Sequence, residues 1–160
     1  MSTAQETATW DRVGCSVAGT LGVVGEKWTL LVLREAFLGV RRFADLQRIL
    51  GAPKAVLTDR LATLVEQGVL VRVPYQAEGE RQRHEYRLTQ KGIDLYPTLV
   101  ALMEWGDRYL TDDVGADGGG APLQLTHRDC GARVRLELVC AEGHTVSGAR
   151  EVRPVPRAAS

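Results

Sequence analysis

The stretch from residue 52 to residue 68, APKAVLTDRLATLVEQG, most constrains the fold, because it predicts a single helix with two different faces. Pro53 suits the first helical position, where its missing N–H is not needed, and Gly68 suits the left-handed residue just past the last turn. Between these ends, apolar residues recur at helical spacing, at Val56, Leu57, Leu61, Leu64 and Val65. The opposite side is small and polar, and consists of Lys54, Ala55, Thr58, Asp59 and Ala62. We expect the apolar stripe to face the core and the polar side to fit into a groove.

Composition bounds the class of protein. A chain of 160 residues with 44% hydrophobic content is long enough for one domain, or one domain with an appendage, and for a real core. Its 20 basic residues balance its 20 acidic ones, so binding to nucleic acid would depend on a local basic patch. The longest apolar run, residues 30–33, is too short to cross a bilayer, which predicts a cytoplasmic protein with no membrane partner. The three cysteines, Cys15, Cys130 and Cys140, are too few for a disulfide framework and are expected to be reduced thiols.

The segments before the opening stretch complete a helix-turn-helix pattern. Residues 1–14 have weak patterning and are expected to form a loose arm, and helices are predicted over residues 15–24, 28–38 and 43–50. The helix over 28–38 is apolar on nearly every side, which indicates a core helix. A turn at Gly51 and Ala52 joins the helix over 43–50 to the one that follows, which is typical of a helix-turn-helix.

After Gly68 the sequence pattern changes from helical to alternating. Residues 69–73 and 84–88 each predict a strand, and residues 74–83 predict a long tip between them. The tip carries Arg81 and Arg83, which would project cations beside the preceding helix. A helix-turn-helix followed by such a hairpin is a winged helix.

A long helix is predicted over residues 90–110. Thr89 suits its N-cap, and Pro97 is expected to bend it slightly. Its apolar surface is wide and comprises Ile93, Leu95, Leu99, Leu102, Met103, Trp105, Tyr109 and Leu110. A surface of this extent predicts a second copy of the chain to cover it, in a homodimer. Trp28 and Trp105 are expected to serve in core or dimer packing rather than in a ligand cage.

Several ordered motifs resemble one family. After Cys15 come GEKWTLLVLREAFLGVRRFADLQRIL, VLTDRLATLVEQGVL, HEYRLTQKG and a helix containing EWG, and this run over residues 15–113 resembles the HxlR family of bacterial winged-helix regulators. The resemblance implies a small dimeric DNA-binding transcription regulator, with a recognition helix at 53–67, a wing at 69–88, and a dimer formed by the N-terminal helix and the helix over 90–110. Candidate dimerisation residues are Leu21, Leu99, Leu102, Met103, Trp105 and Tyr109. The chain departs from relatives at residues 52–55, where isoleucine and serine are often found.

The candidate DNA-contacting residues are Lys54, Ala55, Thr58, Asp59 and Arg60 on the helix, with Arg81 and Arg83 on the wing. The alternatives are a merely solvated helix face and ordinary turn charges. Asp59 would repel phosphates unless it accepts a hydrogen bond from a cytosine amino group. Cys15 matches a cysteine that is a redox sensor in some members of the family, and its alternative is a buried small apolar residue.

The composition changes after Leu110. The Gly- and Asp-rich residues 114–122 predict a flexible linker, and residues 123–155 a small β-rich extension with strands over 133–139 and 145–152. His127, Cys130, Cys140 and His144 flank the first strand as two pairs, which could converge on a tetrahedral zinc ion. The alternative is an unmetallated β-hairpin docked on the winged helix. Residues 153–160 are expected to be disordered.

The predicted fold is α+β, mainly α: a winged helix-turn-helix domain at 15–113 with dimerising terminal helices, followed by a small C-terminal β-hairpin extension. An enzyme is not indicated, because the chain has three histidines, no phosphate-binding glycine loop and no nucleophile motif. No cofactor is expected to be required, and zinc is only a candidate ligand of the C-terminal extension. The predicted function is a sequence-specific regulator of transcription that binds double-stranded DNA as a homodimer and responds to a small molecule or an oxidant. The alternative is a protein-interaction module with an effector- or metal-binding tail.

Overall fold

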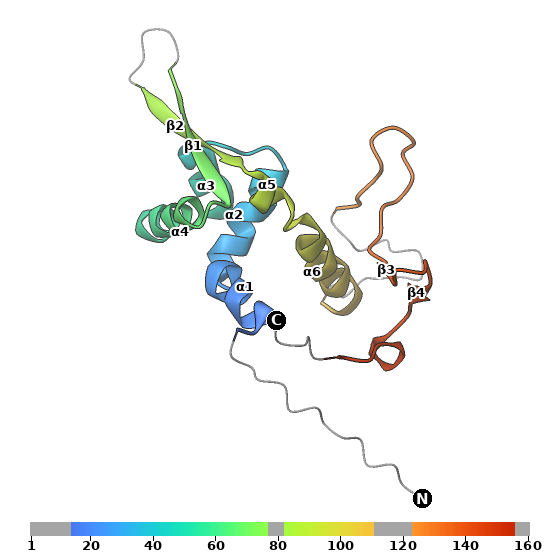
Figure 1. Ribbon diagram of the computed structural model, residues 1–160. Helices are drawn as coiled ribbons and strands as arrows, with labels where there is room; N and C mark the ends of the chain where they lie inside the picture. Colours follow the sequence, from blue (N-terminus) through green and yellow to red (C-terminus); the bar gives the residue numbers. More distant parts are fainter. Residues whose placement is uncertain (1–13, 77–81, 111–122, 156–160) are drawn as a thin grey trace, which may run out of the picture.

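The computed structural model describes residues 14–76, 82–110 and 123–155 of the chain (Figure 1). The predicted loose arm, apart from Gly14, lies outside the described residues, as do Arg81, the linker at 114–122 and residues 156–160. The element order is that of a winged helix, with a tail after the last long helix (Figure 1).

Four helices precede the wing: α1 (Ser16–Val24), α2 (Lys27–Phe37), α3 (Phe43–Leu50) and α4 (Lys54–Glu66). Helix α2 is central, since it contacts α1, α3 and α4 as well as the wing. The fully buried side chains of α4 are Leu57, Leu61 and Leu64, which confirms the centre of the predicted inward stripe, while Val56 and Val65 at its edges are half-buried. They pack with Val32 and Leu33 of α2 in one hydrophobic core. Burial of these side chains is the main source of stability of the domain.

The wing is the antiparallel pair β1 (Leu70–Tyr75) and β2 (Arg83–Leu88). Leu70 lies opposite Leu88, and Tyr75 lies opposite Arg83. The segment before α3 runs along β2, because the N–H of Tyr86 donates to the carbonyl of Arg41 at 2.7 Å and a bridge joins Arg42 to Glu85. The wing is therefore tied to the helix-turn-helix by backbone hydrogen bonds.

The predicted end of α4 at Gly68 and the predicted cap at Thr89 are confirmed, whereas Pro53 is the N-cap of α4 and Lys54, not Pro53, is its first helical residue. Gly68 has a φ of 67°, a left-handed conformation that glycine adopts at little cost. The Thr89 hydroxyl accepts from the N–H of Gly92 at 3.2 Å and donates to the carbonyl of Gly68 at 2.6 Å. Thr89 thus caps the next helix and joins it to the end of α4.

The prediction of one continuous helix over residues 90–110 is wrong. The structure has α5 (Gln90–Ile93), a break at Asp94 and Leu95, and α6 (Tyr96–Tyr109). Pro97 explains the break, because it has no N–H to donate to the carbonyl of Ile93 and its ring would clash there. It lies instead in the first turn of α6, where a missing N–H costs nothing.

Gly92 is buried where α5 meets the wing. A Cβ placed on Gly92 would lie 2.3 Å from the carbonyl oxygen of Val69 and 3.0 Å from Cδ2 of Leu88. Only a residue without a side chain allows the backbone to approach this closely.

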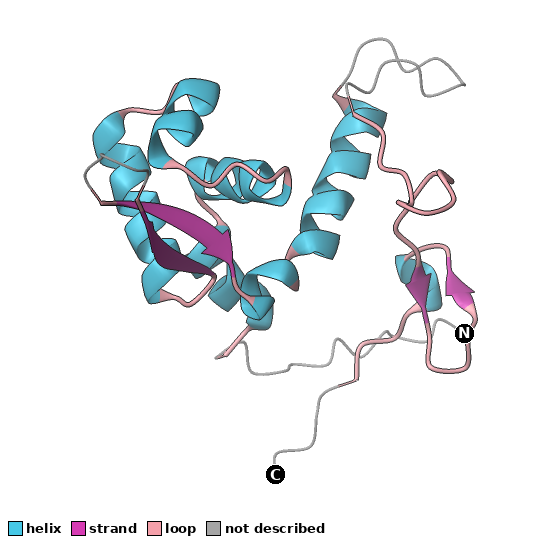
Figure 2. Cartoon of the chain, turned by 90° about the horizontal axis from the view of Figure 1, so that it is seen from above, coloured by secondary structure: helices cyan, strands magenta, loops and turns pink. Residues whose placement is uncertain are grey.

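The tail at 123–155 has less regular structure than predicted. Its strands are only β3 (Leu138–Val139) and β4 (Thr145–Val146), an antiparallel pair, with a short 3₁₀ helix at Ala149–Glu151. The longer strands predicted at 133–139 and 145–152 are wrong, because none of the described tail residues is buried and a strand needs a surface to pack against. The tail lies beside α6 (Figures 1 and 2), where the N–H of Leu136 donates to Oε1 of Glu104 at 2.8 Å.

Within the described ranges, no single helix is long and apolar enough to cross a membrane. Together, α1 and α2 have the length and apolar composition of a membrane-spanning segment, but a bend of 79° separates them.

Candidate nucleic-acid interface

The outer face of α4 has the shape and polarity predicted for it. Lys54, Ala55, Thr58 and Asp59 are all exposed, while the opposite side of the helix is buried in the core. The Thr58 hydroxyl donates to the carbonyl of Lys54 at 2.8 Å, within the helix. Apart from Lys54, these side chains are short, so this face of the helix is low.

Arg60 forms an ion pair with the Asp59 carboxylate and is itself half-buried. The pairing offsets the negative charge that Asp59 alone would bring to a phosphate backbone. The structure thus brings together the five predicted residues of α4, with Arg60 set back from the exposed face.

The wing carries basic side chains beyond those predicted. Arg83 is exposed at the start of β2, next to the tip that contains Arg81. Nη2 of Arg72 lies 3.3 Å from Nδ1 of His84 across the two strands, and both side chains are exposed. Arg72 was not among the predicted residues. Alternation along the strand places its side chain on the face opposite to Val71 and Val73, and this pattern could have indicated it.

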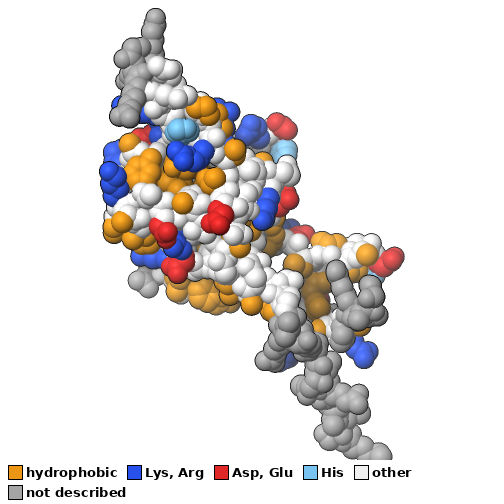
Figure 3. Space-filling model, turned by 60° about the vertical axis from the view of Figure 1, so that its left-hand side comes forward, with side chains coloured by type: hydrophobic (Ala, Val, Ile, Leu, Met, Phe, Trp, Pro, Cys, Tyr) orange, Lys and Arg blue, Asp and Glu red, His pale blue; other side chains and the backbone are white. Residues whose placement is uncertain are grey.

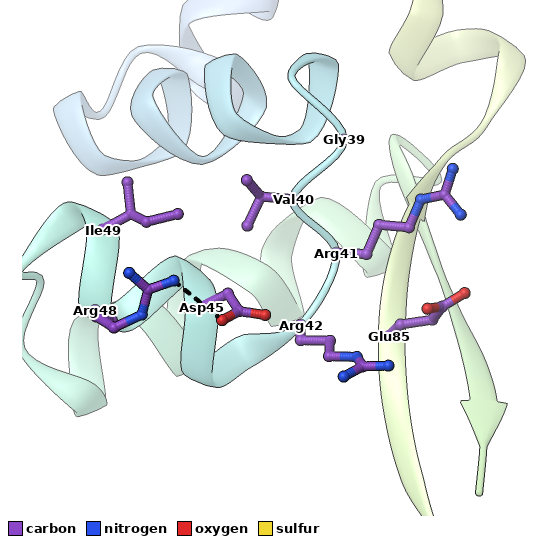
Figure 4. Close-up of a pocket in the computed structure, with 8 residues that line it drawn as sticks. All are labelled: Gly39, Val40, Arg41, Arg42, Asp45, Arg48, Ile49 and Glu85. Carbon is purple, nitrogen blue, oxygen red and sulfur yellow. Dashed lines mark hydrogen bonds and ion pairs between the residues drawn. The ribbon is translucent and has the colours of Figure 1, made fainter. Parts of the chain in front are cut away.

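A cleft of 410 Å³ lies between α3 and β2 (Figure 4), lined by Gly39, Val40, Arg41, Arg42, Asp45, Arg48, Ile49 and Glu85. Arg48 pairs with Asp45 at 3.3 Å, and the guanidinium of Arg42 lies 4.6 Å from the centre of the Tyr75 ring. Glu85 is paired with Arg87 of its own strand. The three arginines of the cleft, Arg41, Arg42 and Arg48, were not among the predicted residues. Arg41 and Arg42 are adjacent in sequence just before α3, and this basic pair could have indicated a site for an anion.

Lys and Arg side chains occur over the face that bears the wing and the helix-turn-helix, interspersed with acidic and apolar groups (Figure 3). This distribution agrees with the balanced composition of the chain. Attraction of a polyanion would therefore depend on a few local cations rather than on the field of the whole molecule.

The candidate dimerisation residues lie in different environments. Leu21, Leu102, Trp105 and Tyr109 are exposed apolar side chains, Met103 is half-buried, and Leu99 packs against the core of its own chain. The Trp105 and Tyr109 rings are 5.4 Å apart. They line a cleft of 590 Å³ between α6 and the tail, together with Ala101, Glu104, Arg108, Leu136 and Leu138.

All three cysteines are unpaired in the structure. Cys15 is half-buried at the N-cap of α1, and the other two are exposed in the tail. Each tail cysteine lies next to one histidine: Sγ of Cys130 is 3.4 Å from Nδ1 of His127, and Sγ of Cys140 is 3.6 Å from Nδ1 of His144. Within the described ranges, however, the structure has no group of three or more His, Cys, Asp or Glu side chains placed to hold one ion. The structure therefore forms the two predicted pairs but does not bring the pairs together.

Comparisons with known proteins match both the helix-turn-helix and the tail. A family model described as HxlR-like helix-turn-helix matches residues 23–114. An uncharacterised HTH-type transcriptional regulator of Mycobacterium tuberculosis is 48% identical over 143 residues, which cover 89% of this chain and 86% of that relative. YdeP of Bacillus subtilis, also an HTH-type transcriptional regulator, is 32% identical over 62% of this chain and 77% of its own length.

Two solved structures show the same architecture. The crystal structure of PA1607, described as a proposed transcription factor, has a TM-score of 0.76 and 37% identity, with 97% of this chain and 100% of that chain covered. The oxidised form of the redox regulator HypR has a TM-score of 0.54 and 32% identity, over 59% of this chain and 96% of that one. The chain therefore belongs to the HxlR-like helix-turn-helix family of transcription regulators, and its DNA-binding fold is a winged helix.

Proposed function

We propose that the chain binds double-stranded DNA sequence-specifically, as a homodimer, and regulates transcription through that binding. The observation that carries the proposal is the outer face of α4, which is exposed and polar. The opposite face of the helix is buried in the core, and the basic wing follows it in the chain. An α-helix of this kind fits the major groove, where base edges present distinct patterns of donors and acceptors. The relatives are regulators of transcription, and we assign this chain no catalytic role.

We assign base reading and backbone contact to different residues. Lys54 and Thr58 lie in the first turns of α4, and the N-terminal part of a recognition helix is the part that contacts bases. Arg83 and Arg72 are exposed on the wing, and Arg41 lines the adjacent cleft. We assign phosphate contacts to these cations, because such contacts fix the position of the protein on the duplex without reading its sequence.

The proposed dimer rests on the exposed apolar side chains of α1 and α6. Leu21 is 58% exposed and Leu102 is 49% exposed, and leaving such side chains in water forgoes the hydrophobic stabilisation that a partner surface would provide. A two-fold dimer would place its two α4 helices about 34 Å apart, one turn of the double helix, on a pseudo-palindromic site.

The DNA assignment is tested by fluorescence anisotropy on the duplex upstream of the protein's own gene and on a scrambled duplex, each at several salt concentrations. Arg83→Ala should weaken binding to both duplexes alike and lower the salt slope by about one unit, because one phosphate contact is lost. Lys54→Ala should cost about 1 to 3 kcal/mol on the specific duplex alone, because a base contact is lost. Equal losses on both duplexes for Lys54→Ala would contradict its role in base reading. No duplex binding by the folded wild-type protein would instead favour the protein-interaction alternative.

The dimer is tested by replacing Leu102 with glutamate. A carboxylate on the apolar face of α6 should produce a monomer at micromolar concentration, measured by analytical ultracentrifugation, because burying an unpaired charge costs several kcal/mol. Leu38→Glu is the matched control, because Leu38 is 58% exposed but lies outside α1 and α6, and this variant should remain a dimer. A wild-type protein that is monomeric under these conditions would contradict the proposal.

A further inference from the structure

The two Cys–His pairs of the tail each lie in a turn that contains a left-handed glycine, although the two turns differ in length. In the first, the N–H of Gly131 donates to the carbonyl of His127 at 2.8 Å, and Gly131 has a φ of 68°. In the second, the N–H of Gly143 donates to the carbonyl of Cys140 at 2.9 Å, and Gly143 has a φ of 82°. A left-handed glycine next to one member of each pair lets the chain reverse tightly, so that the cysteine and the histidine come together.

The distance within each pair is that of a hydrogen bond, and it is also close to the distance between two ligands of one tetrahedral zinc ion. Zinc binds thiolate sulfur at about 2.3 Å and imidazole nitrogen at about 2.0 to 2.1 Å, so two such ligands on one tetrahedral ion lie about 3.5 to 3.6 Å apart. The observed separations of Sγ and Nδ1 are 3.4 Å in the first pair and 3.6 Å in the second. Each pair therefore has the spacing of two ligands of a tetrahedral ion. Nδ1 of His127 also accepts from the N–H of Cys130 at 3.4 Å, and binding of an ion would replace that hydrogen bond. All four residues are exposed, so an ion can reach them.

The tail also lacks the packing that would stabilise it without a cross-link. None of the described residues between 123 and 155 is buried, and β3 and β4 are two residues each. A segment of this size without a core depends on a disulfide, a metal or docking on a larger surface. The two tail cysteines are free thiols, which leaves metal binding open to them.

We propose that the tail binds one Zn²⁺ per chain through Nδ1 of His127 and His144 and the thiolates of Cys130 and Cys140. Binding releases the two thiol protons to solvent, and the two thiolate charges balance the charge of the ion. Because the structure leaves the pairs apart, the turn at 127–131 and the turn at 140–144 must close on each other around the ion. Zinc thereby joins the two halves of the tail. The inference concerns the tail alone and stands whether or not the winged helix binds DNA.

The test uses the full chain, stripped of metal with a chelator under reducing conditions and titrated with zinc against a colorimetric chelator. We expect one zinc per chain. Titration with Co²⁺ should give the intense visible bands of a tetrahedral ion and a thiolate-to-cobalt charge-transfer band. Cys130→Ser and Cys140→Ser should each lower zinc affinity more than about 100-fold, since even residues that only support a ligand contribute 10- to 100-fold.

Two controls separate the site from other thiols and imidazoles. Cys15→Ser and His84→Asn remove the cysteine and the histidine that lie outside the tail, and both variants should bind zinc like the wild type. Protease cleavage between residues 123 and 155 should slow on zinc addition in the wild type and in these controls, but not in Cys130→Ser. The winged helix should retain its melting temperature in Cys130→Ser and Cys140→Ser, because no tail residue contributes to the core.

Three outcomes would overturn the proposal. The first is full zinc binding by Cys130→Ser, which would rule out the ligand set. The second is one zinc per two chains, which would show that the pairs are shared between copies rather than closed within one chain. The third is an octahedral Co²⁺ spectrum without a charge-transfer band, which would show that the thiolates do not bind the ion.

Discussion

Gly92→Ala should lower the free energy of unfolding by about 3 kcal/mol, near the upper end of what overpacking costs. The new Cβ would lie 2.3 Å from the Val69 carbonyl oxygen, far closer than a carbon and an oxygen normally approach. That carbonyl accepts from the N–H of Thr89 at 3.1 Å, so it cannot withdraw without loss of the hydrogen bond. Relief of the clash would therefore separate α5 from the start of the wing.

Urea unfolding followed by circular dichroism, at one fixed protein concentration, measures this effect. The matched control is Gly22→Ala in α1, where a Cβ would have no atom within 4 Å. That change should stabilise the helix by up to about 1 kcal/mol, because alanine has the higher helix propensity. If both variants were stabilised alike, the result would contradict the close contact between the backbone of α5 and the carbonyl of Val69.

Ala55→Glu should lower affinity for the specific duplex by about 100-fold. Ala55 is exposed in the first turn of α4, and a carboxylate there would approach phosphates and acceptor-rich base edges, at a cost of about 3 kcal/mol. The substitution should not harm folding, because an acidic side chain near a helix N-terminus is favourable. Loss of binding can then be assigned to the interface rather than to the fold.

The control for Ala55→Glu is Ala149→Glu, which adds the same charge at an exposed position of the tail. It should change affinity less than about threefold at moderate salt, because charges separated by more than a Debye length are largely screened. Anisotropy titrations measure the affinity of both variants for the specific duplex, and melting curves check that both variants are folded. A similar loss of affinity in both variants would show that net charge matters and that the outer face of α4 does not enter the groove.

The winged helix could be predicted because its signals are local. The apolar spacing at Leu57, Leu61 and Leu64 marks the buried side of α4, and Gly68 marks its end. Both depend on residues a few positions apart, so no knowledge of the tertiary fold is needed. The same holds for Thr89, whose capping role follows from the residues just after it.

The features that could not be predicted from the sequence depend mainly on contacts between segments that are distant in the chain. The arginine cleft forms because the segment at Arg41 pairs with β2, some forty residues later, and no local pattern indicates that pairing. The α5–α6 break shows that the effect of Pro97 was underestimated, since a proline can bend a helix or end it. In the tail, alternation near Leu138 suggested a long strand, but alternation alone cannot tell whether a packing surface exists.

The hydrogen bond between Tyr86 and Arg41 has a mechanical consequence. Because it ties the wing to the segment before α3, and because β1 also contacts α4, the wing and the helix-turn-helix form one connected unit, here called the winged-helix head. The break at Asp94 and Leu95, by contrast, interrupts the helical connection between this head and α6. A signal that shifts α6 in the proposed dimer should therefore rotate each head as one body, so that the distance between the two α4 helices changes. Such a regulator would respond by changing the spacing between half-sites that it accepts, while the bases read within each half-site stay the same.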